Sequence, residues 1–301
     1  MRRLVAFVRL SRLKFLVGGL AGGALGTAIA FFETHGIVPA AYALAQITIT
    51  SAHLMTHYAN DYFDQASDAR TTRTPYSGGS GVLIDGTLDP KVALVAALVC
   101  SIASLAGDVL LVVTGHPLAA ALGIGMLALA WSYSAPPMRF VARGLGELDT
   151  AVVVAILVPL CAYAAQMPSL DVRVLASTVP GAAAMFVMMV CVQVPDLAAD
   201  AATGKRNLVV RLGASRAVRL AFAAIVAEAG GVALALAFGA PAAFAAFQLV
   251  ALVPLALLVT PLRAFGAGRS IVPAGLAARG VALFATVAIA GALGYAYAAI
   301  V

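Results

Sequence analysis

The chain has 301 residues, of which 62% are hydrophobic and only 11% are charged, and its formal net charge is +6. A soluble globular domain has roughly 45–50% apolar and about 25% charged residues, so this composition excludes an ordinary soluble protein and indicates a polytopic membrane protein. The basic residues flank apolar segments in the pattern that sets membrane topology, which argues against nucleic acid as a partner. The three cysteines all lie inside apolar runs, and this odd number argues against a disulfide framework.

The first fourteen residues carry five basic side chains and precede an apolar run at 15–32. A basic start before an apolar run also describes a signal peptide, but 18 residues are enough to span a bilayer, and we expect this segment to be retained. Eight more apolar runs follow it. The sequence therefore predicts an all-α membrane protein with nine transmembrane helices in a bundle around a central cavity, at 15–32, 37–59, 91–114, 117–135, 148–166, 173–194, 214–238, 241–262 and 274–300.

The distribution of Lys and Arg predicts the orientation of these helices. With a cytoplasmic N-terminus, the loops 60–90, 136–147, 195–213 and 263–273 lie inside. Of the 19 Lys and Arg residues, only Arg173 then falls at an outer helix end. Cytoplasmic loops carry an excess of basic residues, so we expect the N-terminus inside and the C-terminus outside a bacterial-type inner membrane.

Two acidic clusters follow the second and the sixth predicted helices, on the same predicted side of the membrane. In the first, Asn60, Asp64 and Asp68 have i, i+4, i+8 spacing with Asp61 beside them; in the second, Asp196 and Asp200 are four residues apart. On a helix each set lines one face, where like charges repel by a few tenths of a kcal/mol per pair. These clusters therefore need a positively charged partner.

Basic and glycine-rich segments adjoin both clusters. Arg73 and a Ser77-Gly78-Gly79-Ser80-Gly81 loop follow the first, and Lys205 and Arg206 follow the second. A third segment contains Tyr133 and Arg139. Mg²⁺ is usually held by one or two carboxylates plus substrate phosphates, and Arg or Lys would neutralise the remaining phosphate oxygens. A metal-bridged diphosphate with a lipid tail satisfies both signs of charge, so the pattern indicates chemistry on a prenyl diphosphate.

The segment Asn60-Asp-Tyr-Phe-Asp64-Gln-Ala-Ser-Asp68 matches the NDxxDxxxD signature of the UbiA superfamily of intramembrane aromatic prenyltransferases, and Asp196-Leu-Ala-Ala-Asp200 with Gly204 matches its second motif. The order and separation of the motifs and the nine-helix count also fit. The chain thus resembles this superfamily as a single domain over 1–301, with motif loops at about 60–90 and 195–213.

Within the superfamily, residues 143–148 and 204–213 look most like 1,4-dihydroxy-2-naphthoate prenyltransferases of menaquinone biosynthesis. Four positions depart from the expected pattern: Asn207 replaces Thr, Leu13 replaces Pro, His57 replaces Asn and Arg139 replaces Lys. Other acceptors, such as 4-hydroxybenzoate or homogentisate, remain alternatives. No sequence pattern determines the donor chain length, the oligomeric state or the number of metal ions.

The resemblance implies Mg²⁺-dependent transfer of a polyprenyl group from its diphosphate to a small aromatic acceptor at the cytoplasmic side, among membrane lipids. It implies a metal-binding group consisting of Asn60, Asp61, Asp64, Asp68, Asp196 and Asp200. It implies substrate binding by Arg73, Arg139, Lys205, Arg206, Tyr133, Ser77 and Gly78. Asp64, Asp196, Arg139 and Lys205 would act in catalysis, and Tyr62, Phe63, Trp131 and Tyr133 could stabilise an allylic cation.

Several polar residues permit another interpretation. Acidic side chains of a membrane protein also line the pathways of ion or phosphate transporters, although transporters place such groups near the bilayer midplane on broken helices. His53 and His57 have the spacing of a zinc pair, but we expect them to line the pocket or to bond within the core, because Mg²⁺ disfavours imidazole. Asp108 and Glu228 lie within spans, and no motif assigns them a role.

Overall fold

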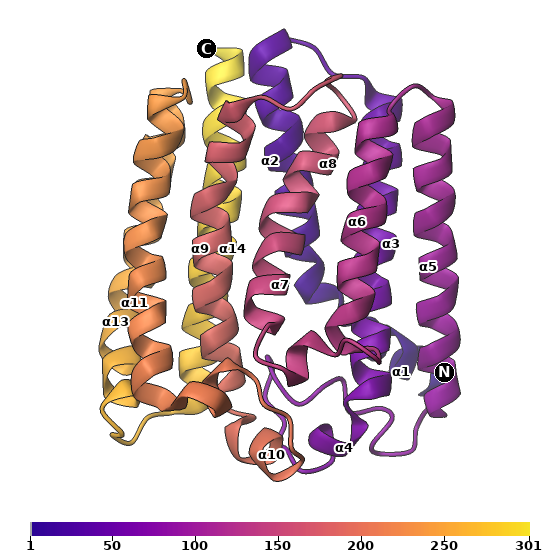
Figure 1. Ribbon diagram of the computed structural model, residues 1–301, viewed down its shortest axis with the longest axis vertical. Coiled ribbons are helices and arrows are strands. Elements are labelled where there is room, and N and C mark those ends of the chain that lie inside the picture. The colour runs from indigo at the N-terminus through magenta and orange to yellow at the C-terminus, as the bar shows by residue number, and fades with distance from the viewer. Residues whose placement is uncertain (1) are drawn as a thin grey trace.

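The structure is a computed structural model that describes residues 2–301, and every regular element in that range is a helix. The long helices run side by side, and the two ends of the chain lie at opposite ends of the bundle (Figure 1). Eight segments are long and apolar enough to cross a membrane, namely 2–34, 90–113, 117–134, 146–164, 172–193, 208–237, 242–266 and 273–300. The chain is therefore an integral membrane protein.

The helices begin and end close to the predicted limits. The α-helices are α1 (Arg2–Ser11), α2 (Val17–Thr34), α3 (Pro39–Phe63), α4 (Gln65–Asp68), α5 (Pro90–Val113), α6 (Pro117–Ser134), α7 (Gly146–Val152), α8 (Val158–Ala164), α9 (Val172–Gln193), α10 (Leu197–Ala202), α11 (Leu208–Ala237), α12 (Ala242–Gln248), α13 (Leu252–Gly266) and α14 (Pro273–Ile300). Four of them begin with proline, whose fixed φ and missing N–H suit the first helical position. The proline positions therefore explain these four helix starts.

The predicted span at 37–59 is present as the 25-residue helix α3, although it is not among the eight apolar segments. Its polar side chains, such as Gln46 and His53, lower its hydropathy.

Four elements differ from the prediction in detail. The first predicted span is preceded by the separate helix α1, and the fifth contains a π-helical turn at Val153–Leu157. The seventh begins earlier, at Leu208, and passes through a kink at Gly213. The eighth contains a 3-10 turn at Leu249–Ala251.

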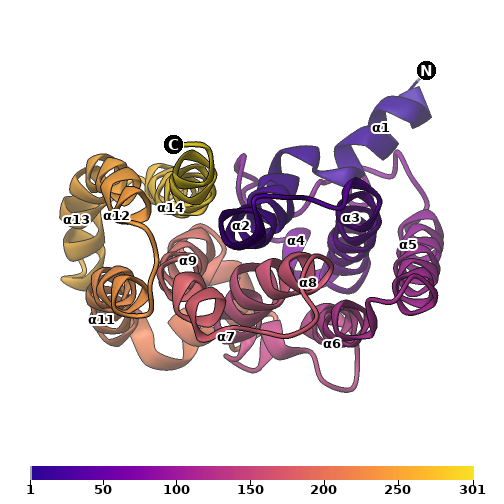
Figure 2. The same ribbon diagram turned by 90° about the horizontal axis from the view of Figure 1, so that it is seen from above.

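The short helix α4 lies at one end of the bundle (Figure 1). Seen from above, α4 lies beneath the middle of the bundle, between α2 and α3, and α1 projects outward from it (Figure 2). α3 packs along α5, α9 along α11 and α14 along α2. On the outer surface, Val99, Ile102 and Val113 of α5 are each more than half exposed. Because water would penalise such a surface, these side chains face lipid.

Glycines allow the inner helices to approach closely. At Gly26 of α2, an added Cβ would lie 2.0 Å from the carbonyl oxygen of Pro159 in α8. Small residues permit such backbone contacts in membrane bundles, where dispersion and close packing provide much of the association energy. The contact therefore fixes how near α2 lies to the helix that forms one wall of the central space.

Gly26→Ala should lower the melting temperature of the purified protein, since an added methyl group in a tightly packed core costs roughly 1–3 kcal/mol. The matched control is Gly125→Ala in α6, where an added Cβ has no neighbour within 4 Å. There the melting temperature should stay level or rise, because Ala is the better helix former. Equal effects of the two substitutions on thermal unfolding would contradict this account.

Candidate active site

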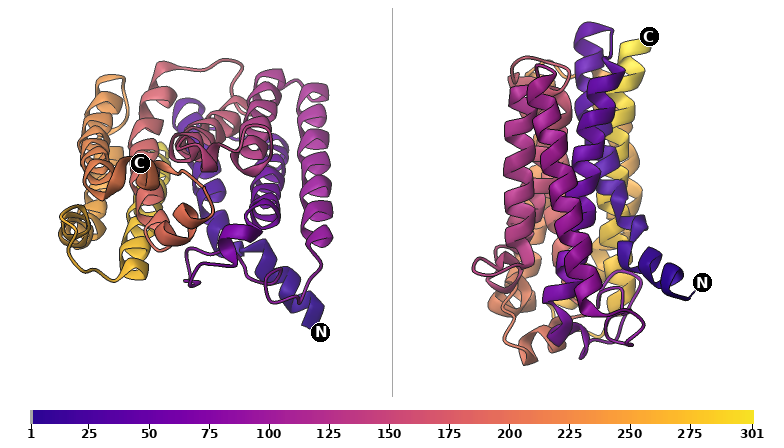
Figure 3. Two further views of the ribbon diagram at one scale, coloured as in Figure 1. Left: turned by 60° about the horizontal axis from the view of Figure 1, so that its bottom comes forward. Right: turned by 90° about the vertical axis from the view of Figure 1, so that its right-hand side faces the viewer.

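The two acidic motifs lie together at the end of the bundle that carries the N-terminus. α4 and α10 are neighbours there (Figures 1 and 3). The Arg70 guanidinium donates a hydrogen bond to the carbonyl oxygen of Ala202, which joins the loops after the two motifs. Segments about 130 residues apart in the sequence thus form one site.

The first motif keeps helical hydrogen bonding through a break at Asp64. The amide of Asp64 donates to the carbonyl of Asn60, and the amide of Asp68 donates to that of Asp64. Asn60, Asp64 and Asp68 therefore follow one another along one side of the chain, as their spacing predicted. The Asn60 amide nitrogen lies 2.8 Å from Asp64 Oδ2 and 3.2 Å from Ser134 Oγ, so it connects α3 to α6.

Asp61 differs from the other acids of its motif in its partners, although its carboxylate lies near that of Asp68. Its carboxylate accepts hydrogen bonds from the amide and the hydroxyl of Ser80, and it lies 3.6 Å from the Arg12 guanidinium. It does not line the pocket described below. In this structure Asp61 anchors the glycine-rich loop and the segment after α1, instead of facing the space in which a metal would bind.

The glycine-rich loop passes over the first motif. Gly79 has φ +63°, and a Cβ at this position would lie 2.2 Å from Asp68 Oδ2. Both the left-handed conformation and the lack of space require glycine here. Ser77 and Gly78 line the pocket and lie close enough to the Asp196 carboxylate to favour its ionised form. The loop therefore contacts both acidic motifs.

The second motif is held by the segment that follows it. The amide of Asp200 donates to the carbonyl of Asp196, so the two carboxyl groups share a face. Asn207 caps α11 by accepting from the amide of Val210, and its side-chain nitrogen donates to Asp200 Oδ2 at 2.7 Å. Asn207 departs from the family pattern in sequence, but it positions this carboxylate by a direct hydrogen bond.

Lys205 joins the two motifs electrostatically. Its Nζ lies 2.9 Å from Asp64 Oδ2 and 3.6 Å from Asp200 Oδ1. Burial lowers the pKa of Lys205, but the carboxylates of Asp64 and Asp200 outweigh burial and raise this pKa above its ordinary value. Lys205 is therefore a buried ammonium group between two acids.

The remaining carboxyl groups lack sufficient positive charge. Burial, with Asp64 and Asp61 nearby, raises the pKa of Asp68 to about 7, and burial with Asp200 nearby raises the pKa of Asp196 to about 6. Asp64 Oδ1 and Asp196 Oδ1 are buried without a hydrogen-bond partner among residues 2–301. One lysine therefore does not compensate the negative charge that the two motifs bring together.

A cavity of about 220 Å³ connects these groups to the interior of the bundle. A dry cavity of about 150 Å³ holds a benzene molecule, so this one has room for an aromatic ring. Its polar end contains Asn60, Asp64, Asp68, Ser77, Gly78, Gly79, Asp196, Asp200, Lys205 and Asn207, and its inner walls include Ile49, Met126, Val153, Val154, Val158, Met188, Met189 and Val192. The cavity thus combines a charged mouth with apolar walls.

The structure places some expected residues outside this cavity and adds others. Arg73, Arg139 and Arg206 are exposed and do not line it. Tyr133 lines it, whereas Tyr62, Phe63 and Trp131 pack against one another elsewhere.

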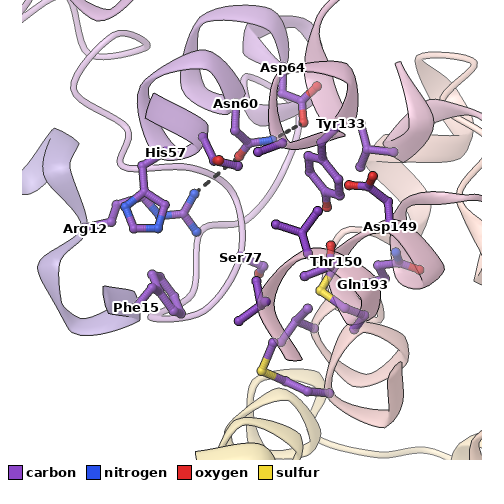
Figure 4. A pocket seen from close by; sticks show the side chains of 18 of the residues that line it. Arg12, Phe15, His57, Asn60, Asp64, Ser77, Tyr133, Asp149, Thr150 and Gln193 are labelled. Atoms are coloured by element: carbon purple, nitrogen blue, oxygen red, sulfur yellow. Dashed lines mark hydrogen bonds between the residues drawn. The ribbon is translucent and has the colours of Figure 1, made fainter. Parts of the chain in front are cut away.

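Among the residues that the motifs did not single out, Arg12, Phe15, Asp149 and Gln193 line the cavity (Figure 4). The Arg12 guanidinium donates to Asn60 Oδ1 at 3.3 Å and lies 4.8 Å from the centre of the Phe15 ring. The sequence signal for Arg12 lay in the basic segment before the first span, and nothing in the spacing of the motifs indicated Asp149 or Gln193.

The His and Asp side chains near the cavity are the candidate metal ligands. Among the described residues, no three His, Cys, Asp or Glu side chains are grouped as a ready-made metal site, and His57 Nδ1 lies 2.8 Å from the carbonyl oxygen of Ser11. A zinc pair at His53 and His57 therefore has no third ligand. The unpaired oxygens of Asp64 and Asp196 are the hard donors that Mg²⁺ prefers, and Mg²⁺ commonly takes only one or two carboxylates alongside water and phosphate. The residues present fit Mg²⁺ held jointly with a diphosphate.

Solved structures with high structural similarity identify the fold of this chain. The apo structure of a UbiA homologue from Aeropyrum pernix K1 has a TM-score of 0.71 at 16% identity, with 93% of this chain and 96% of that chain covered. A UbiA homologue from Archaeoglobus fulgidus bound to GPP and Mg²⁺ has a TM-score of 0.64 at 15% identity, with 97% and 99% covered. The fold is that of the UbiA homologues.

The model of the UbiA prenyltransferase family matches residues 16–270, and the chain belongs to this family. It is 31% identical over 242 residues to the 1,4-dihydroxy-2-naphthoate octaprenyltransferase of Mycobacterium tuberculosis, which covers 79% of this chain and 80% of that protein. The protein is thus an enzyme, a prenyltransferase of the class that transfers alkyl or aryl groups other than methyl.

Lys205→Met should lower the melting temperature in EDTA, because it leaves Asp64 and Asp200 without their buried cation. Removing one partner of a buried ion pair costs roughly 3 kcal/mol or more. Added Mg²⁺ should restore part of the lost melting temperature if it binds the same carboxylates. Lys91→Met, at an exposed position of α5, is the matched control. It should change neither the melting temperature in EDTA nor the response of that temperature to Mg²⁺. A Lys205→Met protein as stable as wild type in EDTA would refute the bridging role.

Proposed function

We propose that this protein transfers a polyprenyl group from a prenyl diphosphate to 1,4-dihydroxy-2-naphthoate in menaquinone biosynthesis, in a Mg²⁺-dependent reaction within a single domain over 1–301. The observation that carries the donor half is the pair of unsatisfied acidic motifs around Lys205 at the mouth of an apolar cavity. The acceptor follows from the 31% identity to the mycobacterial octaprenyltransferase. Another hydroxyaromatic acceptor, such as 4-hydroxybenzoate or homogentisate, is the alternative.

The charges at the mouth of the cavity would bind the diphosphate. Asn60, Asp64, Asp68, Asp196 and Asp200 would hold Mg²⁺, while Asp61 would anchor the loop above them. Bound Mg²⁺ would supply positive charge to the leaving diphosphate. Lys205 has three N–H donors and only two acidic neighbours, so it would also donate to a diphosphate oxygen.

Three exposed arginines belong to the loops at this end of the bundle. Arg73, Arg139 and Arg206 would attract the anionic donor toward the mouth, since fields of one sign raise the local concentration of a charged substrate. Their role would thus be electrostatic steering, whereas Arg12 and Lys205 line the cavity itself.

The inner cavity would protect the reaction. As the C–O bond to diphosphate breaks, positive charge develops on the allylic carbon, and the ring of Tyr133 could stabilise it. The methionine and valine side chains of the walls would exclude water, which would otherwise capture the cation. An electron-rich carbon of the acceptor would then form the new C–C bond, and for a dihydroxynaphthoate the displaced group is CO₂.

The assay of this proposal uses purified protein, Mg²⁺, farnesyl or a longer prenyl diphosphate, and dihydroxynaphthoate. Wild type should release diphosphate and form a prenylated naphthoquinol. Asp64→Ala and Asp196→Ala should each reduce turnover about a hundredfold or more, as expected when a preorganised electrostatic group is lost. Asp108→Asn, a buried change outside the cavity, should retain activity. Full turnover by both alanine variants would rule out the metal assignment.

We also propose nine spans, with the N-terminus and the active site on the cytoplasmic side of a bacterial inner membrane. The excess of Lys and Arg at one end of the bundle supports this orientation. In a cysteine-free background, Ser270→Cys should react with a membrane-impermeant maleimide only after permeabilisation, and Ser169→Cys in intact cells; both positions are exposed, in loops at opposite ends of the bundle. The reverse labelling pattern would overturn the orientation.

A transporter is the less favoured function. Its ionisable groups would line a path near the membrane midplane. The acids with unpaired oxygens in the cavity's charged mouth, Asp64 and Asp196, instead belong to motifs at one end of the bundle.

A further inference from the structure

A second polar group lies in the cavity, separate from the two acidic motifs. Asp149 of α7 and Gln193 of α9 line the cavity together with Tyr133 and Thr150, on the side away from Arg12 and His57 (Figure 4). Asp149 is 8% exposed and Gln193 is 7% exposed. Both side chains are therefore almost completely removed from solvent, and their polar atoms need partners inside the protein or from a ligand.

Each of these side chains has an acceptor oxygen without a partner. Asp149 Oδ1 and Gln193 Oε1 are buried and accept no hydrogen bond from any described residue. Asp149 also forms no ion pair within residues 2–301. An unpaired buried acceptor costs about 1–3 kcal/mol, so two of them in one cavity wall indicate a ligand that donates.

The orientation of the Gln193 amide follows from its other contact. Glu147 Oε1 accepts hydrogen bonds from Gln193 Nε2 at 2.5 Å and from the amide of Leu208 at 2.8 Å. Because the Leu208 amide can only donate, Glu147 Oε1 is an acceptor, so the NH₂ group of Gln193 faces Glu147 and its oxygen faces the other way. Glu147 thus holds the amide so that its oxygen remains an acceptor.

No neighbouring side chain among the described residues donates a hydrogen bond to either oxygen. The Thr150 hydroxyl already donates to the carbonyl of Gly146 at 2.8 Å. The cations of the cavity are Arg12, which contacts Asn60, and Lys205, which contacts Asp64 and Asp200. The cavity wall also contains the apolar side chains of Val153, Val154, Met188 and Val192. The surroundings therefore suit a flat apolar body that carries O–H donors.

We propose that Asp149 and Gln193 form the acceptor subsite and receive hydrogen bonds from the free hydroxyl groups of a hydroxyaromatic ring. This inference rests on the proposed prenyl transfer and adds how the acceptor is recognised. A carboxylate on the same ring points toward Arg12 and Lys205, the cations that line the cavity. The subsite selects rings with a free hydroxyl and rejects their ethers, because an ether oxygen leaves both acceptors unpaired.

The test compares wild type with Asp149→Ala and Asp149→Asn, using farnesyl diphosphate with Mg²⁺ and dihydroxynaphthoate. Leaving a buried hydroxyl of the acceptor without its hydrogen-bond partner corresponds to about ten- to hundredfold weaker binding, so the alanine variant should raise the acceptor KM by that factor. The asparagine variant keeps an acceptor oxygen and should show a smaller increase. The donor KM should stay within about twofold of wild type in both variants, because no acidic motif is altered.

A second measurement separates recognition from a general change in structure. Hydroxyl-methylated dihydroxynaphthoate ethers are tested as inhibitors of the transfer. Wild type should bind them about tenfold or more weakly than hydroxyl-bearing analogues, and Asp149→Ala should lose most of this discrimination. Asp108→Asn is the matched control, because Asp108 is a buried aspartate like Asp149 but lies outside the cavity. Both of its carboxylate oxygens lack a hydrogen-bond partner among the described residues. This variant should leave both KM values and the discrimination unchanged.

The outcomes distinguish the two proposals. If wild type transfers no prenyl group to any aromatic acceptor, the proposed function fails. If wild type transfers it, but Asp149→Ala keeps the wild-type acceptor KM and discriminates against ethers as before, the acceptor subsite is refuted while prenyl transfer stands. A selective loss of acceptor affinity and of hydroxyl discrimination in Asp149→Ala, with the donor KM preserved, supports the subsite.

Discussion

The structure depends most on the enclosure of like-charged carboxylates at one end of an apolar bundle. Asp64 and Asp200 come from separate motifs and share the ammonium group of Lys205. Their mutual repulsion, and the cost of removing them from water, exceed what one lysine compensates, as the raised pKa values of Asp68 and Asp196 show. A site with this imbalance favours the entry of further positive charge and is destabilised in its absence.

The surrounding bundle makes this arrangement possible by holding the helices at close distances. Gly26 brings α2 against the backbone of α8, and Gly79 lets the loop after α4 pass directly over Asp68. Asp61 and Ser80 tie that loop to α3, while Asn207 ties the start of α11 to Asp200. The charged end is thus built from short polar contacts, and the apolar helices limit how far its parts can separate.

The cavity divides its polar groups between two tasks. At its mouth, unpaired carboxylate oxygens and Lys205 suit an anion together with a metal. Further along the wall, Asp149 and Gln193 offer acceptors without a cation. An anionic substrate could therefore bind at the mouth and a substrate that donates hydrogen bonds could bind further along the wall, without competition for the same atoms. The apolar wall between these groups would keep water away from the reacting carbon.

The sequence by itself determined the membrane class, the approximate helix limits and the two acidic motifs, because hydropathy, prolines at helix starts and i, i+4 spacing are local properties of the chain. It also indicated that both motifs lie at one end, through the distribution of Lys and Arg. Only the tertiary structure decided that Asp61 turns to Ser80 instead of the cavity, that Arg139 and Arg206 are exposed, and that Lys205 is enclosed. The same holds for Arg12, Asp149 and Gln193, whose side chains meet the site from segments with no shared motif. The physical reason is that burial and hydrogen-bond partners depend on contacts between helices distant in sequence, which no local spacing records.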